Sequence, residues 1–238
     1  MEQNQKLLPY RIQILTTLNQ NYLPRLQVLI TSLHINQPGE QLDIWLMHSG
    51  IPEEALAPVS RQCQAFGFGF HPVEIDGSAF TDAPVSSQYP REMYYRLLSG
   101  QFLPERLHRI LYLDPDILVI NSLRPLWETD MQGHLFAAAA HTGKTELANN
   151  INQLRLGTDH NYYNSGVLLI DLDRARQEIR AEELFEYVRE HGKELLLPDQ
   201  DILNAVYGSR TMEIDDSIWN YDARNYNNYL LRSAGMCD

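Results

Sequence analysis

Residues Arg109–Ile120, with the sequence RILYLDPDILVI, decide the fold that we expect for this chain. The apolar run Ile110–Leu113 is typical of a strand buried inside a parallel sheet, and a second apolar run, Ile117–Ile120, follows it. An Asp-Pro-Asp tripeptide at residues 114–116 separates the two runs. Because Pro115 has no N–H to donate, it suits a point where a strand leaves the hydrogen-bonded ladder.

The two acids of this tripeptide, Asp114 and Asp116, are the first candidates for a functional site. In an extended segment, side chains two residues apart point to the same side, and carboxylates flanked by apolar runs are costly unless a cation neutralises them. A hard divalent cation such as Mn²⁺ or Mg²⁺, sharing oxygen ligands with a diphosphate, would do so. Asp-Pro-Asp is also ordinary turn chemistry, and the spacing alone leaves both interpretations open.

Composition indicates one globular domain over residues 1–238, with 44% hydrophobic and 21% charged residues. The net charge of −12 argues against a nucleic acid partner, so an anionic ligand must be held locally by a metal, an arginine or a helix N-terminus. The two cysteines, Cys63 and Cys237, lie far apart in the sequence, which favours a reducing compartment over a disulfide framework. The sequence contains no apolar run long enough for a transmembrane segment and no signal-peptide core, which makes a cytoplasmic protein the default expectation.

The first third of the chain predicts strands that alternate with helices. Apolar periodicity places these elements at residues 12–17, 23–33, 42–48, 52–66 and 68–75. A β-α-β-α-β order predicts an α/β fold with a mainly parallel, mixed central sheet flanked by helices. Pro72 in the third strand predicts that this strand lies near an edge of the sheet.

The rest of the chain gives weaker local signals. We expect a long loop at 77–90, a helix at 91–98, a small-residue strand or helix at 135–140, no regular element at 141–161, a buried strand at 167–171, one surface helix at 172–190 and a helix start at 198. Taken locally, Arg96 suits a structural ion pair, and Asn164-Ser165 suits a bare turn. Asp199 and Asp201 are better explained by the helix dipole than by catalysis. The aromatic and amide residues at 219–229 could stack on a sugar or form a packed coil.

Four blocks in order resemble family eight of the retaining glycosyltransferases, which includes glycogenin and the bacterial lipopolysaccharide galactosyl- and glucosyltransferases. The blocks are LYLDPD at 111–116, LRPLW at 123–127, YNSGVLL at 163–169 and DQDILN at 199–204. The resemblance covers nearly the whole chain from Arg11 onward, and it implies a GT-A fold that binds a UDP-sugar with Mn²⁺ or Mg²⁺.

Carried over by position, the resemblance also assigns site residues. It implies that Asp114 and Asp116 are metal ligands that hold the UDP diphosphate, and that Arg96 contacts the phosphate and the sugar. It implies that the uracil is contacted by Asn19, Asn21 and Tyr22. It also implies that the donor sugar is lined by Asn164, Ser165, Asp199 and Gln200. Asp199 and Gln200 are then the catalytic candidates nearest the anomeric carbon. Asn19 stands where the family usually has Asp.

The implied activity is transfer of glucose or galactose from a UDP-sugar to a hydroxyl of a saccharide or glycolipid acceptor, as in lipopolysaccharide biosynthesis. Peripheral contact with a membrane stays open. Retention of configuration could proceed through a covalent intermediate or by same-face attack of the acceptor, and a Gln is a poor nucleophile for the first route. A non-catalytic sugar-nucleotide-binding protein is the alternative function. An aspartyl-phosphate hydrolase is less favoured, because Leu118 stands where that class carries Thr or Val.

One family block is absent from the sequence. The third metal ligand of the family is a His in a C-terminal His-x-x-Gly-x-x-Lys-Pro-Trp block, and no such block precedes Asp238. We therefore expect that this sequence stops short of that block. His141, which follows a point where the family carries an acid, is an outside candidate for a substitute ligand.

Overall fold

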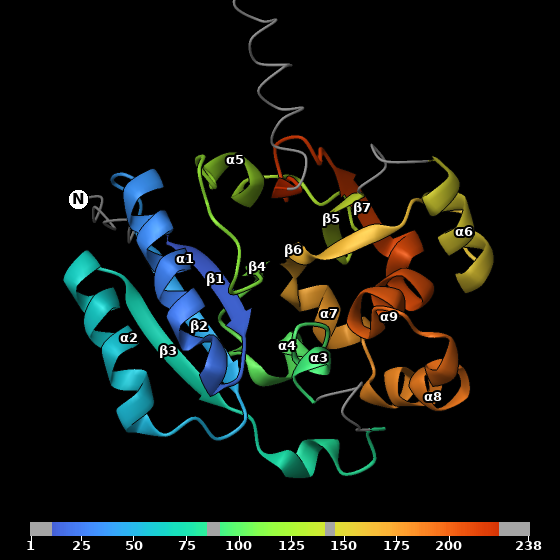
Figure 1. The fold of residues 1–238 in the computed structure, drawn as a ribbon, viewed down its shortest axis with the longest axis horizontal. Helices are drawn as coiled ribbons and strands as arrows, with labels where there is room; N and C mark the ends of the chain where they lie inside the picture. Colours follow the sequence, from blue (N-terminus) through green and yellow to red (C-terminus); the bar gives the residue numbers. More distant parts are fainter. Residues whose placement is uncertain (1–10, 85–90, 141–145, 224–238) are drawn as a thin grey trace, which may run out of the picture.

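The computed structural model describes residues 11–84, 91–140 and 146–223 (Figure 1). Its centre is a sheet of seven strands in the order β3-β2-β1-β4-β6-β5-β7. The strands are β1 (Ile12–Thr17), β2 (Leu42–His48), β3 (Gly69–Glu74), β4 (Arg109–Leu113), β5 (Phe136–Ala140), β6 (Tyr163–Asp171) and β7 (Thr211–Ile214). Strand β6 runs antiparallel to both of its neighbours, and the other pairings are parallel. This confirms the expected α/β fold with a mainly parallel, mixed sheet.

Helices cover both faces of this sheet. The α-helices are α1 (Leu23–Asn36), α2 (Glu53–Phe66), α3 (Glu92–Tyr95), α4 (Ser99–Phe102), α5 (Arg124–Trp127), α6 (Glu146–Leu156), α7 (Leu172–Glu178), α8 (Ala181–His191) and α9 (Pro198–Tyr207). Short 3-10 turns lie at Gln20–Tyr22, Gly77–Phe80, Gly192–Glu194 and Gly208–Arg210. In the described part of the chain, no helix combines the length and the apolar character needed to cross a bilayer.

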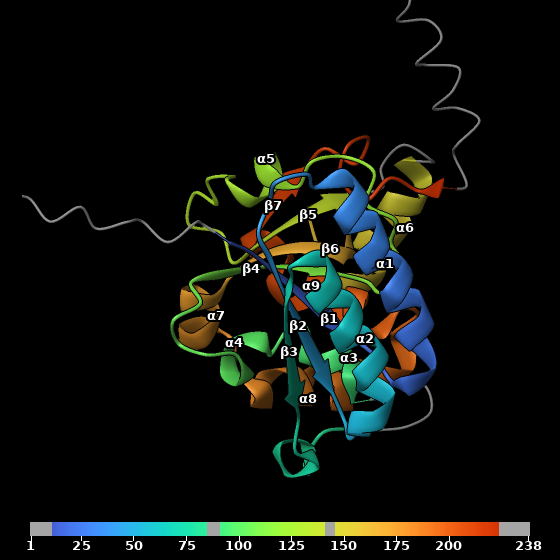
Figure 2. The same ribbon diagram turned by 90° about the vertical axis from the view of Figure 1, so that its left-hand side faces the viewer.

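Strand β4 shows why the centre of the sheet is buried on both sides. Its side chains alternate, so that Tyr112 belongs to one apolar core while Leu111 and Leu113 belong to the other. Helices α1, α2 and α5 pack into the second core, and α3, α4, α7, α8 and α9 pack into the first. Figure 2 shows α1 and α2 together on one face of the sheet and α4 and α7 on the opposite face. The continuous apolar run of β4 is the sequence signature of this two-sided burial.

The N-terminal part of the fold follows the sequence prediction closely. Strand β3, which carries Pro72, forms one edge of the sheet, as predicted. Helix α1 accepts Pro24 in its first turn, where a missing N–H costs nothing. Cys63 lies on the apolar face of α2 and is fully buried.

The apolar run Ile117–Ile120 does not form a second strand after β4. The carbonyl of Asp114 accepts a hydrogen bond from the N–H of Ile117 at 3.1 Å, so the chain turns here and leaves the sheet. Leu118 and Ile120 are consequently 62% and 61% exposed. The buried Val119 is held instead by α1, where Asn36 donates to its carbonyl.

Three further expectations need correction or completion. The segment 141–161 was expected to lack regular structure, yet α6 occupies Glu146–Leu156; His141 itself lies outside the described residues. The single surface helix expected at 172–190 is two helices, because the chain becomes extended at Ile179, whose side chain is buried. The small-residue segment forms strand β5, buried along its whole length.

Candidate active site

A cavity of about 420 Å³ opens at one edge of the sheet, where β1 and β4 end and α9 begins. It is lined by Thr17, Leu18, Asn19, Tyr22, Glu92, Arg96, Asp114, Pro115, Asp116, Pro198 and Asp199. Parallel strands end at the same edge of a sheet, and ligands of open α/β sheets bind outside the carboxyl ends of the strands. The lining therefore gathers segments that lie far apart in the sequence.

Strand β6 brings a second set of polar residues to the same edge. Because β6 is antiparallel to β4, its first residues lie beside the last residues of β4, and the N–H of Asp114 donates to the carbonyl of Gly166 at 2.8 Å. Gly166 leaves room for the side chains on either side of it. A Cβ at Gly166 would stand 2.9 Å from Asp114 Oδ2 and 3.0 Å from Asn164 Oδ1.

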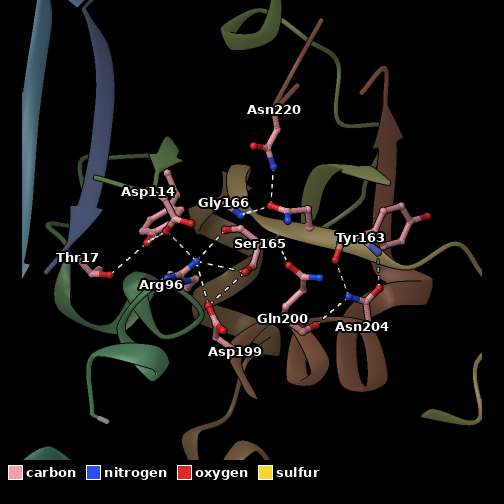
Figure 3. A network of polar contacts seen from close by, with 12 residues as sticks. Thr17, Arg96, Asp114, Tyr163, Ser165, Gly166, Asp199, Gln200, Asn204 and Asn220 are labelled. Carbon is pink, nitrogen blue, oxygen red and sulfur yellow. Dashed lines mark hydrogen bonds and ion pairs between the residues drawn. The ribbon is translucent and has the colours of Figure 1, made fainter. Parts of the chain in front are cut away.

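Arg96 is the cation at the centre of the network in Figure 3. Its Nη1 donates to the carbonyl of Ser165 at 2.9 Å and lies 3.1 Å from both Asp114 Oδ1 and Asp199 Oδ2. Only 11% of the Arg96 side chain is exposed. One guanidinium thus joins three segments, from α9, β6 and the end of β4, and the ion pair expected for a lone buried arginine is present.

Tyr112 supports this network from below. Its ring lies 4.4 Å under the guanidinium carbon of Arg96, which is a favourable cation–π distance. Its hydroxyl donates to Asp114 Oδ1 at 2.7 Å and also lies 3.3 Å from the hydroxyl of Thr17. The side chain of Tyr112 is fully buried, so a residue of the strand interior orients the carboxylate at the strand end.

The charges at this edge perturb one another strongly. Burial raises the pKa of Asp114 above its ordinary value, and the nearby Asp199 and Asp116 raise it further, against the opposing effects of Arg96 and the Tyr112 hydroxyl. For Arg96, burial alone would lower the pKa. Tyr112, Asp199 and Asp114 outweigh that effect and keep the pKa of the guanidinium above its ordinary value. Strongly perturbed groups that share a cavity are typical of functional sites.

The two acids of the Asp-Pro-Asp tripeptide line the same cavity, although the backbone between them turns instead of staying extended. Asp114 is half-buried and Asp116 is exposed. Among the described residues, Asp114 Oδ2 receives no hydrogen bond, while Oδ1 is occupied by Arg96 and Tyr112. No group of three or more His, Cys, Asp and Glu side chains suited to a metal ion occurs in the described ranges. The tripeptide itself offers two carboxylates at this edge.

Of the residues expected at the nucleotide base, Asn19 and Tyr22 line the cavity and Asn21 does not. Asn19 caps a 3-10 turn by accepting the N–H of Asn21 at 3.0 Å through its side-chain oxygen. The ring of Tyr22 is 38% exposed, and the guanidinium of Arg25 lies 4.4 Å from its centroid. Asn21 therefore reaches the site through its backbone contact to Asn19.

The remaining expected residues are not part of the cavity lining: Asn164 is half-buried, and Ser165 and Gln200 are buried. Ser165 donates from its hydroxyl to Asp199 Oδ2 at 3.2 Å and from its backbone to Gln200 Oε1 at 3.4 Å. Asn204, one turn further along α9, accepts the N–H of Tyr163 and donates to its carbonyl, each at 2.7 Å. These bonds join the start of β6 to the first turns of α9.

Several residues of the site were absent from the sequence prediction: Thr17, Glu92, Tyr112, Asn204 and Asn220. Glu92 lines the cavity four residues before Arg96, a helical spacing that could have revealed it. Asn204 belongs to the DQDILN block and could have been included with it. Thr17 and Tyr112 carry no local signal, because their contacts are made to distant segments. Asn220 belongs to the stretch at 219–229 that could contact a sugar or form a packed coil, but no role of its own was predicted for it.

Comparison with known proteins identifies the family to which this chain is similar. The family model described as glycosyl transferase family 8 matches residues 13–233. General stress protein A of Bacillus subtilis (strain 168) is 27% identical over 213 residues, which cover 88% of this chain and 73% of that protein. A lipopolysaccharide 1,2-glucosyltransferase of Escherichia coli is 25% identical over 192 residues, covering 80% of this chain and 57% of that protein.

Among solved structures, the galactosyltransferase LgtC in complex with donor and acceptor sugar analogues has the same fold, with a TM-score of 0.74 at 24% identity. The match covers 86% of this chain and 74% of that one. This chain spans little more than half the length of the lipopolysaccharide glucosyltransferase. Since the family model extends over both the cavity and the polar network behind it, the chain belongs to glycosyl transferase family 8.

Proposed function

We propose that this chain is a retaining glycosyltransferase that moves glucose or galactose from a UDP-sugar to a hydroxyl of a saccharide or glycolipid acceptor. The observation that carries the proposal is the charge of the cavity. Among the described residues, four carboxylates line it, from Glu92, Asp114, Asp116 and Asp199, against the single guanidinium of Arg96. A diphosphate would be repelled by such a wall unless a divalent cation came with it.

The donor set fits a hard divalent cation. Asp114 and Asp116 supply carboxylate oxygens on one wall of the cavity, and Asp114 Oδ2 receives no hydrogen bond from any residue that the structure describes. Magnesium-like ions in nucleotide sites are commonly held by one or two carboxylates together with substrate phosphates and water. Asp114 and Asp116 would therefore hold Mn²⁺ or Mg²⁺, which neutralises negative charge on a leaving diphosphate when bound.

The residues around Arg96 supply the other elements of the proposed reaction. Arg96 would stabilise charge that develops on the leaving UDP, because it is buried, oriented by Tyr112 and permanently protonated. Asn19 and Tyr22 would hold the uracil, and Asn164, Ser165, Asp199 and Gln200 would line the donor sugar. These roles follow the family resemblance, and the cavity supports them by bringing most of these residues to one edge of the sheet.

For the route of retention we favour same-face attack. The acceptor oxygen bonds to the anomeric carbon as the bond to UDP breaks, and the acceptor proton passes to a phosphate oxygen of UDP. Asp199 is a weak candidate for a covalent nucleophile, since its Oδ2 accepts from Ser165 and lies 3.1 Å from Arg96. Gln200 is an amide. Trapping a glycosyl adduct on Asp199 or Gln200 that turns over at the catalytic rate would contradict this route.

The test is a titration of the full chain with UDP, UDP-glucose and UDP-galactose, with and without MnCl₂, followed by assay of slow hydrolysis to UDP. We expect metal-dependent binding that Asp114→Asn abolishes. Asp173→Asn is the matched control, since it removes an acid from α7 that does not line the cavity. Absence of metal-dependent UDP binding in the parent chain would refute the proposal.

Binding without any turnover would favour the alternative, a non-catalytic sugar-nucleotide-binding protein. The aspartyl-phosphate hydrolase interpretation loses its support, because the family model that matches residues 13–233 is that of a glycosyl transferase. A cytoplasmic location with peripheral membrane contact belongs to the proposal. The relative named as a lipopolysaccharide 1,2-glucosyltransferase supports a glycolipid acceptor.

A further inference from the structure

Asn220 has an unusual backbone conformation. In the described ranges, only Asn220 (φ 62°) and Gln132 (φ 48°) are non-glycine residues with a positive φ. Gln132 lies in an exposed turn beside Gly133, where such a conformation is common. Asn220 follows β7 by six residues, is partly buried, and lies next to the candidate active site (Figure 3). Strained backbone beside a functional site is a reason to ask what the side chain does there.

The Asn220 side chain makes one polar contact in the described structure, and that contact is to the site. Its Nδ2 donates to Asn164 Oδ1 at 2.5 Å, across 56 residues of sequence. The same oxygen accepts the backbone N–H of Gly166 at 2.8 Å. Because a backbone N–H can only donate, the Asn164 atom that faces Gly166 must be the oxygen, and the Asn220 atom that faces this oxygen must be the amide nitrogen.

These two hydrogen bonds determine which group of the Asn164 amide is available to a ligand. Two donors occupy its oxygen, and its Nδ2 donates to no described residue. The carboxamide lies next to Asp114, since a single Cβ placed on Gly166 would touch both Asp114 Oδ2 and Asn164 Oδ1. Asn164 is therefore presented as a hydrogen-bond donor beside the carboxylate that we assign to the metal. A rotated amide would present an acceptor there instead, next to negative charge.

We propose that Asn220 is a positioning residue that fixes the amide of Asn164, so that its NH₂ group meets an acceptor oxygen of the donor sugar. The proposal rests on the proposed function for the identity of the ligand, and on the structure for the orientation of Asn164. The competing explanation is that Asn220 only anchors the chain after β7. The two explanations differ in what removal of the Asn220 side chain does to Asn164.

The decisive variant is Asn220→Gly. Glycine adopts the left-handed conformation without strain, so this change removes the amide while relieving the backbone. Gln132→Gly is the matched control, because it gives the same relief at an exposed turn that does not line the cavity. Asn220→Asp is the reversed-polarity variant, since an aspartate oxygen cannot donate to Asn164 Oδ1 and repels it.

The first readout is the side-chain NH₂ signal of Asn164 in a ¹H–¹⁵N spectrum of the full chain, assigned by its absence in Asn164→Asp. We expect this signal to shift or broaden in Asn220→Gly and Asn220→Asp and to stay unchanged in Gln132→Gly. An unchanged Asn164 signal in Asn220→Gly would overturn the proposal. This readout needs no ligand, so it decides on the positioning role even if UDP binding fails.

The second readout is the rate of UDP-glucose and UDP-galactose hydrolysis with MnCl₂, compared with the Kd of UDP. Loss of one oriented hydrogen bond to the sugar should lower kcat by about ten-fold in Asn220→Gly. The Kd of UDP, which lacks the transferred hexose, should stay at the parent value. Equal kcat values for Asn220→Gly and Gln132→Gly would contradict a role of Asn220 in the reaction. If the parent chain neither bound UDP nor hydrolysed the UDP-sugars, the proposed function would be refuted instead.

Discussion

The buried ion pair between Arg155 and Asp201 gives the sharpest stability prediction. Asp201, in the first turn of α9, is fully buried, and its carboxylate receives five hydrogen bonds. Two come from Arg155 of α6, at 2.8 and 2.6 Å, and one from the Tyr162 hydroxyl at 2.5 Å. The backbone N–H groups of Leu196 and Leu197 supply the other two. One carboxylate thus ties α6 and the α8–α9 connection to the start of α9.

Replacing Arg155 by Met should destabilise the chain by about 3 kcal/mol. Removing one partner of a buried ion pair typically costs about 3–5 kcal/mol, because the remaining charge is left in a poor solvent. The lower end applies here, since three donors to Asp201 remain after the change. For a chain of this size, each kcal/mol lowers Tm by about 2–4 °C, so the expected fall is about 6–12 °C.

The assay is thermal and urea denaturation of Arg155→Met beside a matched arginine variant. Arg174→Met removes an ion pair to Glu178 on α7 in which 43% of the arginine is exposed, and such pairs contribute at most about 1 kcal/mol. The double variant Arg155→Met with Asp201→Asn should lose less stability than the sum of the single changes, because both remove the same interaction. Equal Tm values for Arg155→Met and Arg174→Met, or strictly additive losses, would refute the reasoning.

Two further predictions follow from the same contacts. Gly166→Ala should weaken metal-dependent UDP binding, measured by calorimetry, by at least about ten-fold, because the new Cβ would stand 2.9 Å from Asp114 Oδ2. Little change in Tm is expected, because the backbone accepts alanine at this position. Unchanged affinity would mean that Asp114 does not hold the diphosphate. Burial alone would raise the pKa of Asp201, but the hydrogen bonds from Arg155, Tyr162 and the backbone hold it below its ordinary value. Asp201 therefore stabilises the fold above the unfolded-state pKa of about 3.9, and this contribution is lost as pH falls through the lower folded-state pKa. Urea midpoints measured from pH 5 downward should fall less steeply in Asp201→Asn than in the parent chain, and parallel curves would contradict the assignment.

The half of the fold that was predictable is the half built by local patterns. Residues 12–75 alternate strand and helix with clear periods, and neighbouring strands there pair in parallel through helical crossovers. The sequence did not predict the direction of β6, because the segment before this strand shows no hydrophobic period. Its antiparallel pairing with β4 nevertheless creates the site, by placing Ser165 and Gly166 beside Asp114.

Within the site, the residues that belong to family motifs were predictable, and the residues that orient them were not. Asp114 and Arg96 belong to recognisable blocks, so their presence at the cavity could be expected from the sequence. Tyr112 carries the pattern of an ordinary strand residue. Its role depends on the cation–π contact with Arg96 and on the hydrogen bond from its hydroxyl to Asp114. Asn220 reaches Asn164 across 56 residues, and a contact of that range leaves no trace in local periodicity.

The two acids at the start of α9 show how far helical geometry can sharpen such a prediction. The helix dipole explains both Asp199 and Asp201 equally well, since both lie in the first turn. Residues two apart on a helix, however, point to nearly opposite sides, so the two carboxylates cannot share one environment. The structure turns Asp199 towards Arg96 in the cavity and Asp201 inward to Arg155. Asp201 therefore anchors the helix that presents Asp199, and a defect at Arg155 should reach the site through the displacement of that helix.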